Sequence, residues 1–180
     1  MNRDEVDAAM FDEAGEDELL LAAMMRLGAA GGSIGAGIGG SITGQHGLGA
    51  AGGRGGARGA ARGYKWTKKD VSTGAVSLDG PIGTAAHTVA ETLATVGEPV
   101  GTQTREDGAI ALRAMLGVGL GGLNPVVVTA VLSPARDGSV QVALRTAGRE
   151  GLIKRHPADK ALAKVIAALN DRRRGPDVVA

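Results

Sequence analysis

The C-terminal part of the chain shows two hydrophobic periods, one typical of strands and one typical of helices. From Val140 to Arg145, apolar and polar residues alternate one by one, which predicts a strand with one face in water. Across 82–96, apolar residues recur every three or four positions, which predicts a helix with one buried face. The same helical spacing follows Pro157. We therefore expect a folded domain over residues 66–171.

The expected elements come in the order strand, helix, four strands, helix. Strands are expected at 71–78, 99–104, 110–116, 126–132 and 140–145, and helices at 82–96 and from Pro157 onward. Consecutive strands joined by short turns favour an antiparallel sheet with helices on one face, so the predicted fold class is α+β. This order is similar to that of helix-grip and TATA-binding-protein-like folds, a likeness that implies no function.

Before residue 66 the regular pattern gives way to glycine. Residues 28–63 hold more than half of the chain's 31 glycines. Because glycine loses more backbone entropy on folding than any other residue, we expect 28–65 to be a flexible, partly basic linker. Residues 1–27 form an acidic head with a marginal helix at 5–27, which needs a partner surface to persist. The tail 172–180 is predicted to be disordered.

Glycines spaced by four support a second interpretation of this segment. They form two lines, Gly31, Gly35 and Gly39 on one and Gly28, Gly32, Gly40 and Gly44 on the other. Small residues at this spacing let helices approach closely inside a membrane. From Leu27 to Gly53 there is no formal charge, although large apolar residues are few. The alternative function is therefore a peripheral membrane protein that associates with lipid through 19–53.

The charges are segregated along the chain, although the net charge is only +1. Acidic residues crowd 4–18, and six basic residues follow the glycines: Arg54, Arg58, Arg62, Lys65, Lys68 and Lys69. This stretch predicts contact with phosphates or an anionic membrane surface, with Tyr64 and Trp66 available to stack on bases. The acidic head is a further candidate partner for it. An acidic start is not that of a secretory signal peptide, so we expect a cytoplasmic location, with membrane association as the alternative.

Residues with catalytic or metal-binding patterns are scarce. The chain has no cysteine, and its three histidines are not at metal-ligand spacing. The pattern G-x-G-x-x-G occurs three times, but never between a strand and a helix, so glycine content explains it. His87 is expected to pair with Glu91 on the surface of its helix. We assign no catalytic, cofactor-binding or metal-binding residue, and we expect no enzymatic activity.

One group of basic residues is a candidate anion site. Lys154, Arg155 and His156 immediately precede the last helix, whose free N–H groups favour an anion. Arg113 and Arg145 lie at neighbouring water-facing positions of the sheet and add charge if they point the same way. The expected ligand is a phosphate, a carboxylate or an acidic partner.

These observations predict a non-enzymatic binding or adaptor domain on a flexible N-terminal arm. Its partner would be a protein or a small apolar or anionic ligand, held on the sheet or in the cleft between the sheet and the long helix. Nucleic-acid binding through 54–69 ranks behind the membrane alternative, and an enzyme ranks last.

Overall fold

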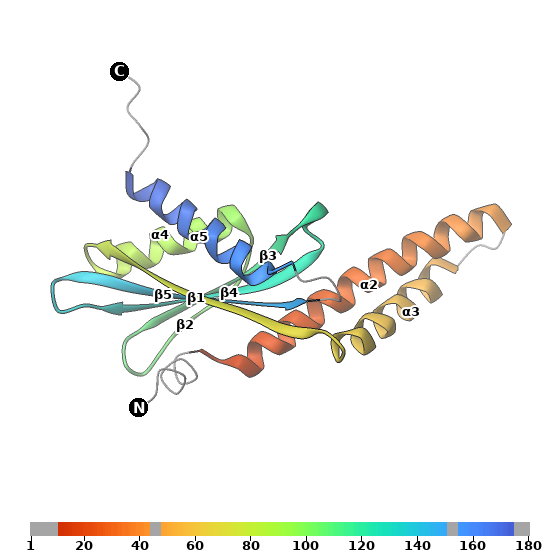
Figure 1. Ribbon diagram of the computed structural model, residues 1–180, viewed down its shortest axis with the longest axis horizontal. Coiled ribbons are helices and arrows are strands. Elements are labelled where there is room, and N and C mark those ends of the chain that lie inside the picture. The colour runs from red at the N-terminus through yellow and green to blue at the C-terminus, as the bar shows by residue number, and fades with distance from the viewer. Residues whose placement is uncertain (1–10, 44–47, 151–154, 175–180) are drawn as a thin grey trace, which may run out of the picture.

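A five-stranded antiparallel sheet forms the centre of the molecule. The computed structural model describes residues 11–43, 48–150 and 155–174 (Figure 1). The strands are β1 (Lys68–Asp79), β2 (Glu98–Thr104), β3 (Ile110–Val118), β4 (Asn124–Pro134) and β5 (Ser139–Glu150), in the spatial order β1-β5-β4-β3-β2. Both edge strands therefore come from the first half of the domain. The predicted α+β class is confirmed.

Two helices, α4 (Ile82–Val96) and α5 (Pro157–Arg174), cover one face of this sheet. The core between them is aliphatic, because the chain has only three aromatic residues. Its fully buried side chains include Val89, Leu93, Val126, Leu132, Leu144 and Leu169. These side chains fill the space between sheet and helices. The cleft expected there for a ligand is a packed core instead.

The elements expected after residue 66 lie close to those observed. The helix predicted at 82–96 is α4 itself, while β1 and β5 are longer than expected. A short 3₁₀ turn, η1 (Leu120–Gly122), lies in the loop before β4. Helix α5 continues to Arg174, three residues into the tail 172–180 that was predicted to be disordered. An ion pair between Arg172 and Glu91 joins it to α4. The predicted His87–Glu91 pair is present, at 3.5 Å. Residues 175–180 lie outside the described part of the chain.

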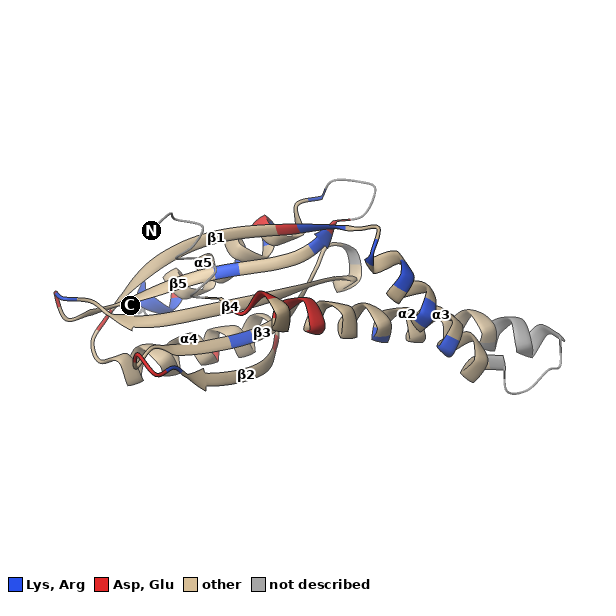
Figure 2. Cartoon of the chain, turned by 90° about the horizontal axis from the view of Figure 1, so that it is seen from below, with Lys and Arg blue, Asp and Glu red and all other residues tan. Residues whose placement is uncertain are grey.

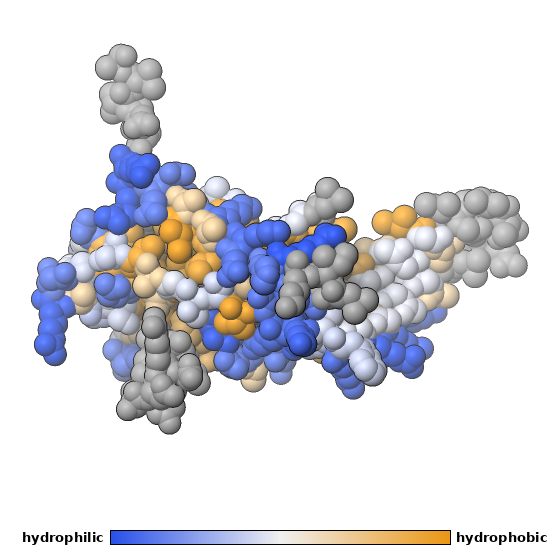
Figure 3. Space-filling view, viewed as in Figure 1, coloured by the Kyte–Doolittle hydropathy of each residue, from blue (hydrophilic) through white to orange (hydrophobic). Residues whose placement is uncertain are grey.

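The glycine-rich segment differs from its prediction. Residues expected to form a flexible linker belong to two antiparallel helices, α2 (Glu13–Thr43) and α3 (Leu48–Tyr64), which project from the domain as a hairpin (Figures 1 and 2). Much of its surface is pale in Figure 3, as small residues of near-neutral hydropathy are. Helix α2 also begins later than the expected 5–27 helix, whose first residues fall outside the described range, and runs on to Thr43.

Close contact between glycines explains why the hairpin can form. A Cβ on Gly28 would lie 2.5 Å from the carbonyl oxygen of Gly56, and Gly32 and Gly52 meet in the same way. Gly31 and Gly35, from the other glycine line, are not used for packing, since a Cβ on either would meet nothing within 4 Å. Spacing by four therefore serves packing between two helices of the same chain.

One helix is long and apolar enough to cross a membrane by length and composition alone, the part of α2 from Glu13 to Ala36, with a hydropathy of 1.4. Its first turns, however, lie against the sheet, where Glu16 and Leu20 are completely buried. In this conformation Glu16 and Leu20 are therefore not free to face lipid.

We predict that Gly56→Leu opens the hairpin, while Gly55→Leu does not. A side chain at 56 meets the backbone of Gly28, whereas a side chain at 55 points into open space. Gly55→Leu should stabilise α3 by up to ~1 kcal/mol, because leucine is the better helix former. Hydrogen exchange of the α3 amides should accelerate in the first variant and slow in the second. Equal behaviour of the two would contradict close glycine packing.

Candidate binding site

The sheet face opposite α4 and α5 carries a row of cations. The strand register places Arg113 of β3, Thr129 of β4 and Arg145 of β5 side by side. Arg149 of β5 and Lys69 of β1 are also paired neighbours in this register. Arg113 and Arg145 point to the same face of the sheet, which was the condition for both to add charge to one site. Four positive side chains therefore gather on one surface.

The first turns of α2, which are rich in acidic residues, lie against this surface (Figure 2). The Arg145 guanidinium lies 3.1 Å from a carboxylate oxygen of Glu16 and 2.6 Å from one of Glu13. The Glu16 side chain has no exposed area, and that of Arg145 is 8% exposed. A buried charge of either sign is costly unless it is paired, so this geometry holds α2 in one position.

Further ion pairs surround the buried one. Lys69 lies 3.5 Å from Glu16, and Arg149 lies 3.2 Å from Asp17. At the start of α2, Arg113 lies 3.3 Å from Asp12. The acidic head thus pairs mainly with arginines of the sheet. Of the basic stretch at 54–69, only Lys69 takes part in the ion pairs found among the described residues.

Apolar and aromatic contacts complete the docking of α2. Leu20 is buried against Val127 and Ala147 of the sheet. The Phe11 ring lies 5.7 Å from the Arg145 guanidinium carbon, and the Tyr64 ring lies 4.0 Å from that of Arg149. Tyr64 also donates a hydrogen bond to Asp17. Its ring is therefore covered, so Tyr64 is not free to stack on bases, contrary to the prediction. Burial raises the pKa of the Tyr64 hydroxyl above its ordinary value.

Asp12 immediately precedes α2 and links this helix to the sheet. Its carboxylate accepts a hydrogen bond from the backbone N–H of Gly15, at 3.1 Å, in the manner of a helix N-cap. This bond, with a smaller contribution from Arg113, lowers the Asp12 pKa below its ordinary value of 3.8. The folded chain thus stabilises the charged form of the Asp12 carboxylate.

A groove remains where α2 leaves the sheet uncovered. It consists of two adjoining hollows of ≈ 740 and ≈ 650 Å³ that share Gln103, Ala111 and Arg113. Helix α2 forms one wall, strand β2 forms the other, and β3 forms the floor. The larger hollow is polar, bordered by Asp12 and the β2–β3 turn, whereas Leu19 and Val100 border the smaller one. Arg113 lies in both.

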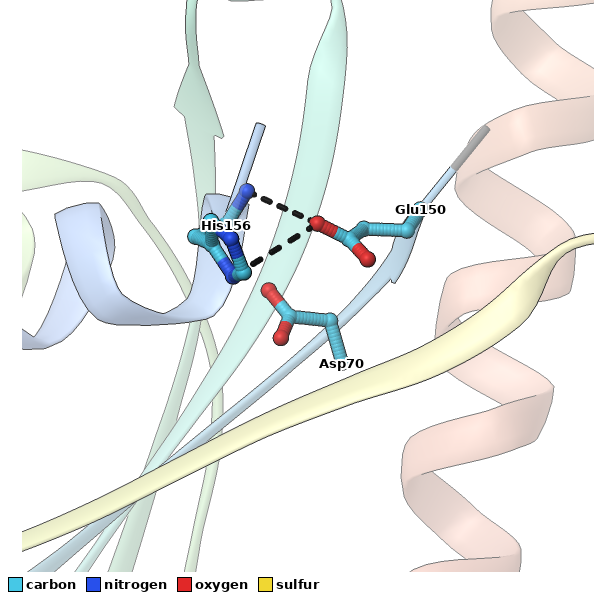
Figure 4. Close-up of side chains that lie close together, drawn as sticks. All are labelled: Asp70, Glu150 and His156. Atoms are coloured by element: carbon cyan, nitrogen blue, oxygen red, sulfur yellow. Dashed lines mark hydrogen bonds and ion pairs between the residues drawn. The ribbon is translucent and has the colours of Figure 1, made fainter. Parts of the chain in front are cut away.

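The predicted anion site at the start of α5 is arranged differently. The backbone N–H groups of Arg155 and His156 donate to Glu150, at 3.0 and 2.9 Å, and that of Ala158 donates to Asp70, at 2.9 Å. Figure 4 shows Glu150 and Asp70 beside His156. The chain's own carboxylates therefore bind these N–H groups. Lys154 lies outside the described residues, and anion binding by Arg155 and His156 stays a prediction.

Arg113 and Arg145 do not join this group. On β5, Thr146 bonds to Ala158 of α5, whereas its neighbour Arg145 bonds to α2, so the two lie on opposite faces of the sheet. The four described residues of the predicted site are thus divided between two places.

Asp70, Glu150 and His156 also place ligand atoms within 4.8 Å of one another, a spacing at which a metal ion can bind. Both carboxylates already accept backbone N–H groups of α5, so capping of that helix accounts for their position. The cluster was not evident in the sequence, because Asp70 lies far along the chain from Glu150 and His156.

We predict that acid weakens the start of α2 through Asp12. Because the folded pKa is lowered, the contribution of Asp12 is complete above 3.8 and is lost as the pH falls through the folded pKa. A carbon NMR titration of the Asp12 carboxyl should give a pKa below 3.8. Arg113→Gln should raise it only in part, since the Gly15 N–H is the larger cause. A pKa at or above the ordinary value would contradict the capping geometry.

Comparison with known proteins gives little beyond this geometry. No protein-family model matches the sequence, and no curated protein matches it. Among solved structures, a START superfamily protein from Mycobacterium smegmatis is 12% identical with a TM-score of 0.33, over 57% of this chain and 95% of that one. An uncharacterized protein from Rhizobium leguminosarum is 8% identical with a TM-score of 0.29, over 57% and 94%. Likeness this low carries no inference about the ligand of this chain, whose α+β fold is established by its own elements.

Proposed function

We propose that this chain is a non-enzymatic binding protein that holds a small amphipathic anion in the groove between α2 and β2. The observation that supports this most is the pair of adjoining hollows around Arg113. Each is within the ~300–1,000 Å³ typical of ligand pockets. Because the packed core excludes a ligand from the other face of the sheet, this groove is the better candidate for the binding surface.

The lining indicates the chemistry of the ligand. Leu19, Ala22 and Val100 offer an apolar surface in the smaller hollow. Arg113 lies next to it, with 19% of its side chain exposed and with its partner Asp12 60% exposed. Since this ion pair is partly in water, an incoming carboxylate, sulfonate or phosphate can exchange with Asp12 at modest cost. A molecule with an apolar body and one anionic end fits both features.

Binding is better supported than catalysis. The residues that line the two hollows include no serine, histidine or lysine, and Thr129 among them accepts a hydrogen bond from Arg113 and does not pair there with a base. The expectation of an adaptor that binds another protein has no comparable feature among the described residues, and it stays a prediction.

Two fluorescent probes test the proposal with the full-length chain. Anilinonaphthalene sulfonate is apolar with one negative charge, and phenylnaphthylamine is a neutral molecule of similar shape. Gly101→Leu should weaken both, because Gly101 lines the groove and a Cβ there meets nothing within 4 Å, so the new side chain fills the groove without strain. Arg113→Gln should weaken only the anionic probe, by about tenfold, the value of one lost charge-assisted hydrogen bond.

Gly83→Leu provides the matched control. Gly83 is also open to solvent, but it lies on α4, away from the groove. This variant should bind both probes as the unmodified chain does. If Gly101→Leu and Arg113→Gln bind both probes with unchanged affinity, the groove is not the binding site.

A further inference from the structure

Every charged residue between Glu18 and Asp70 is basic, and this stretch contains the whole helical hairpin beyond its docked end. The residues are Arg26, Arg54, Arg58, Arg62, Lys65, Lys68 and Lys69. Lys69 is paired with the acidic turns of α2. The other charges are not neutralised by acids in this segment, so the hairpin presents a positive surface.

Three of these arginines form a line on α3. Arg54, Arg58 and Arg62 are spaced by four, and all three side chains are exposed. Residues four apart lie on one face of a helix. The opposite face of α3 carries Gly52 and Gly56, which contact α2. The arginine line therefore points away from the hairpin interface, and blue residues gather along the lower edge of the hairpin in Figure 3.

An unusual aromatic residue lies at the base of the same helix. Trp66 is the only tryptophan of the chain, and 89% of its surface is exposed. Lys65 and Lys68 flank it, both exposed. Tryptophan is enriched at the level of lipid headgroups, where its ring is partly buried and its N–H remains in a polar environment. An exposed tryptophan among cations is thus suited to an anionic membrane surface.

We propose that the outer face of α3, made of Arg54, Arg58 and Arg62 with Lys65 and Trp66 at its base, binds the surface of an anionic lipid bilayer. The hairpin lies on the surface without crossing it, because insertion of α3 would bring Arg54, Arg58 and Arg62 into the hydrocarbon at a high cost. This proposal is independent of the groove.

Lipid fits this surface better than nucleic acid does. Proteins that hold single strands stack successive bases on several aromatic side chains. Here the Tyr64 ring is covered by Arg149 at 4.0 Å, which leaves Trp66 as the one exposed aromatic among the described residues. Attraction to a charged bilayer surface needs no such series of rings.

Trp66 itself is the reporter for the test, since no other tryptophan contributes to the emission. The full-length chain is mixed with vesicles of phosphatidylcholine, with or without phosphatidylglycerol, and both emission and co-sedimentation are recorded. A blue shift and sedimentation are expected only with phosphatidylglycerol, and added salt should weaken both.

The variant R54Q/R58Q/R62Q should bind these vesicles about a hundredfold more weakly, because each basic residue near an anionic surface contributes about fivefold. A control, R136Q/R173Q/R174Q, removes the same charge from exposed positions outside the hairpin and should bind like the unmodified chain. The proposal is overturned if neither vesicle shifts the emission, if both variants lose binding equally, or if an oligonucleotide binds through the same arginines while the vesicles do not.

Discussion

The carboxylate of Glu16, buried against the guanidinium of Arg145, is the contact on which the arrangement of this molecule depends. Removal of one partner from such a buried pair costs about 3–5 kcal/mol, because the charge that remains has lost its main partner. Glu13 and Lys69 share the two charges and so reduce the cost of their burial. The pair fixes the position and direction of α2 on the sheet.

The rest of the N-terminal half follows from this docking. With α2 held at its first turns, Leu20 covers the sheet at Val127, and the remaining turns project from the domain. Glycines at 28, 32, 52 and 56 then allow α3 to pack closely and return the chain to β1. Because α2 crosses the sheet without covering β2, its docking also forms one wall of the groove around Arg113. A contact near the N-terminus therefore shapes both the groove and the hairpin.

The sequence predicted the domain after residue 66 well, because its hydrophobic periods are local and turn residues separate them. It placed Arg113 and Arg145 at water-facing positions of the sheet, which follows from alternation along each strand, but it left open whether the two point the same way. It failed for 28–65. The low helix propensity of glycine favours a flexible linker when each stretch is considered alone, but close packing of α2 against α3 makes the segment helical. Glu16 and Arg149 were missed for the same reason, because their partners are distant in the sequence. Glu16 is 129 positions from Arg145, and Arg149 is 132 positions from Asp17. The signals in the sequence for this pairing are the excess of acid in the head and the alternate basic positions of β5.

A double-mutant cycle on Glu16 and Arg145 tests the central claim most directly. Hydrogen exchange of the α2 amides is measured in the unmodified chain, in Glu16→Gln, in Arg145→Met and in the double variant. If the buried pair holds α2 on the sheet, each single variant should accelerate exchange, and the double variant should be less affected than the sum, with a coupling of about 1–3 kcal/mol. Effects that add within about 0.5 kcal/mol would show that the two side chains act independently and that other contacts position α2.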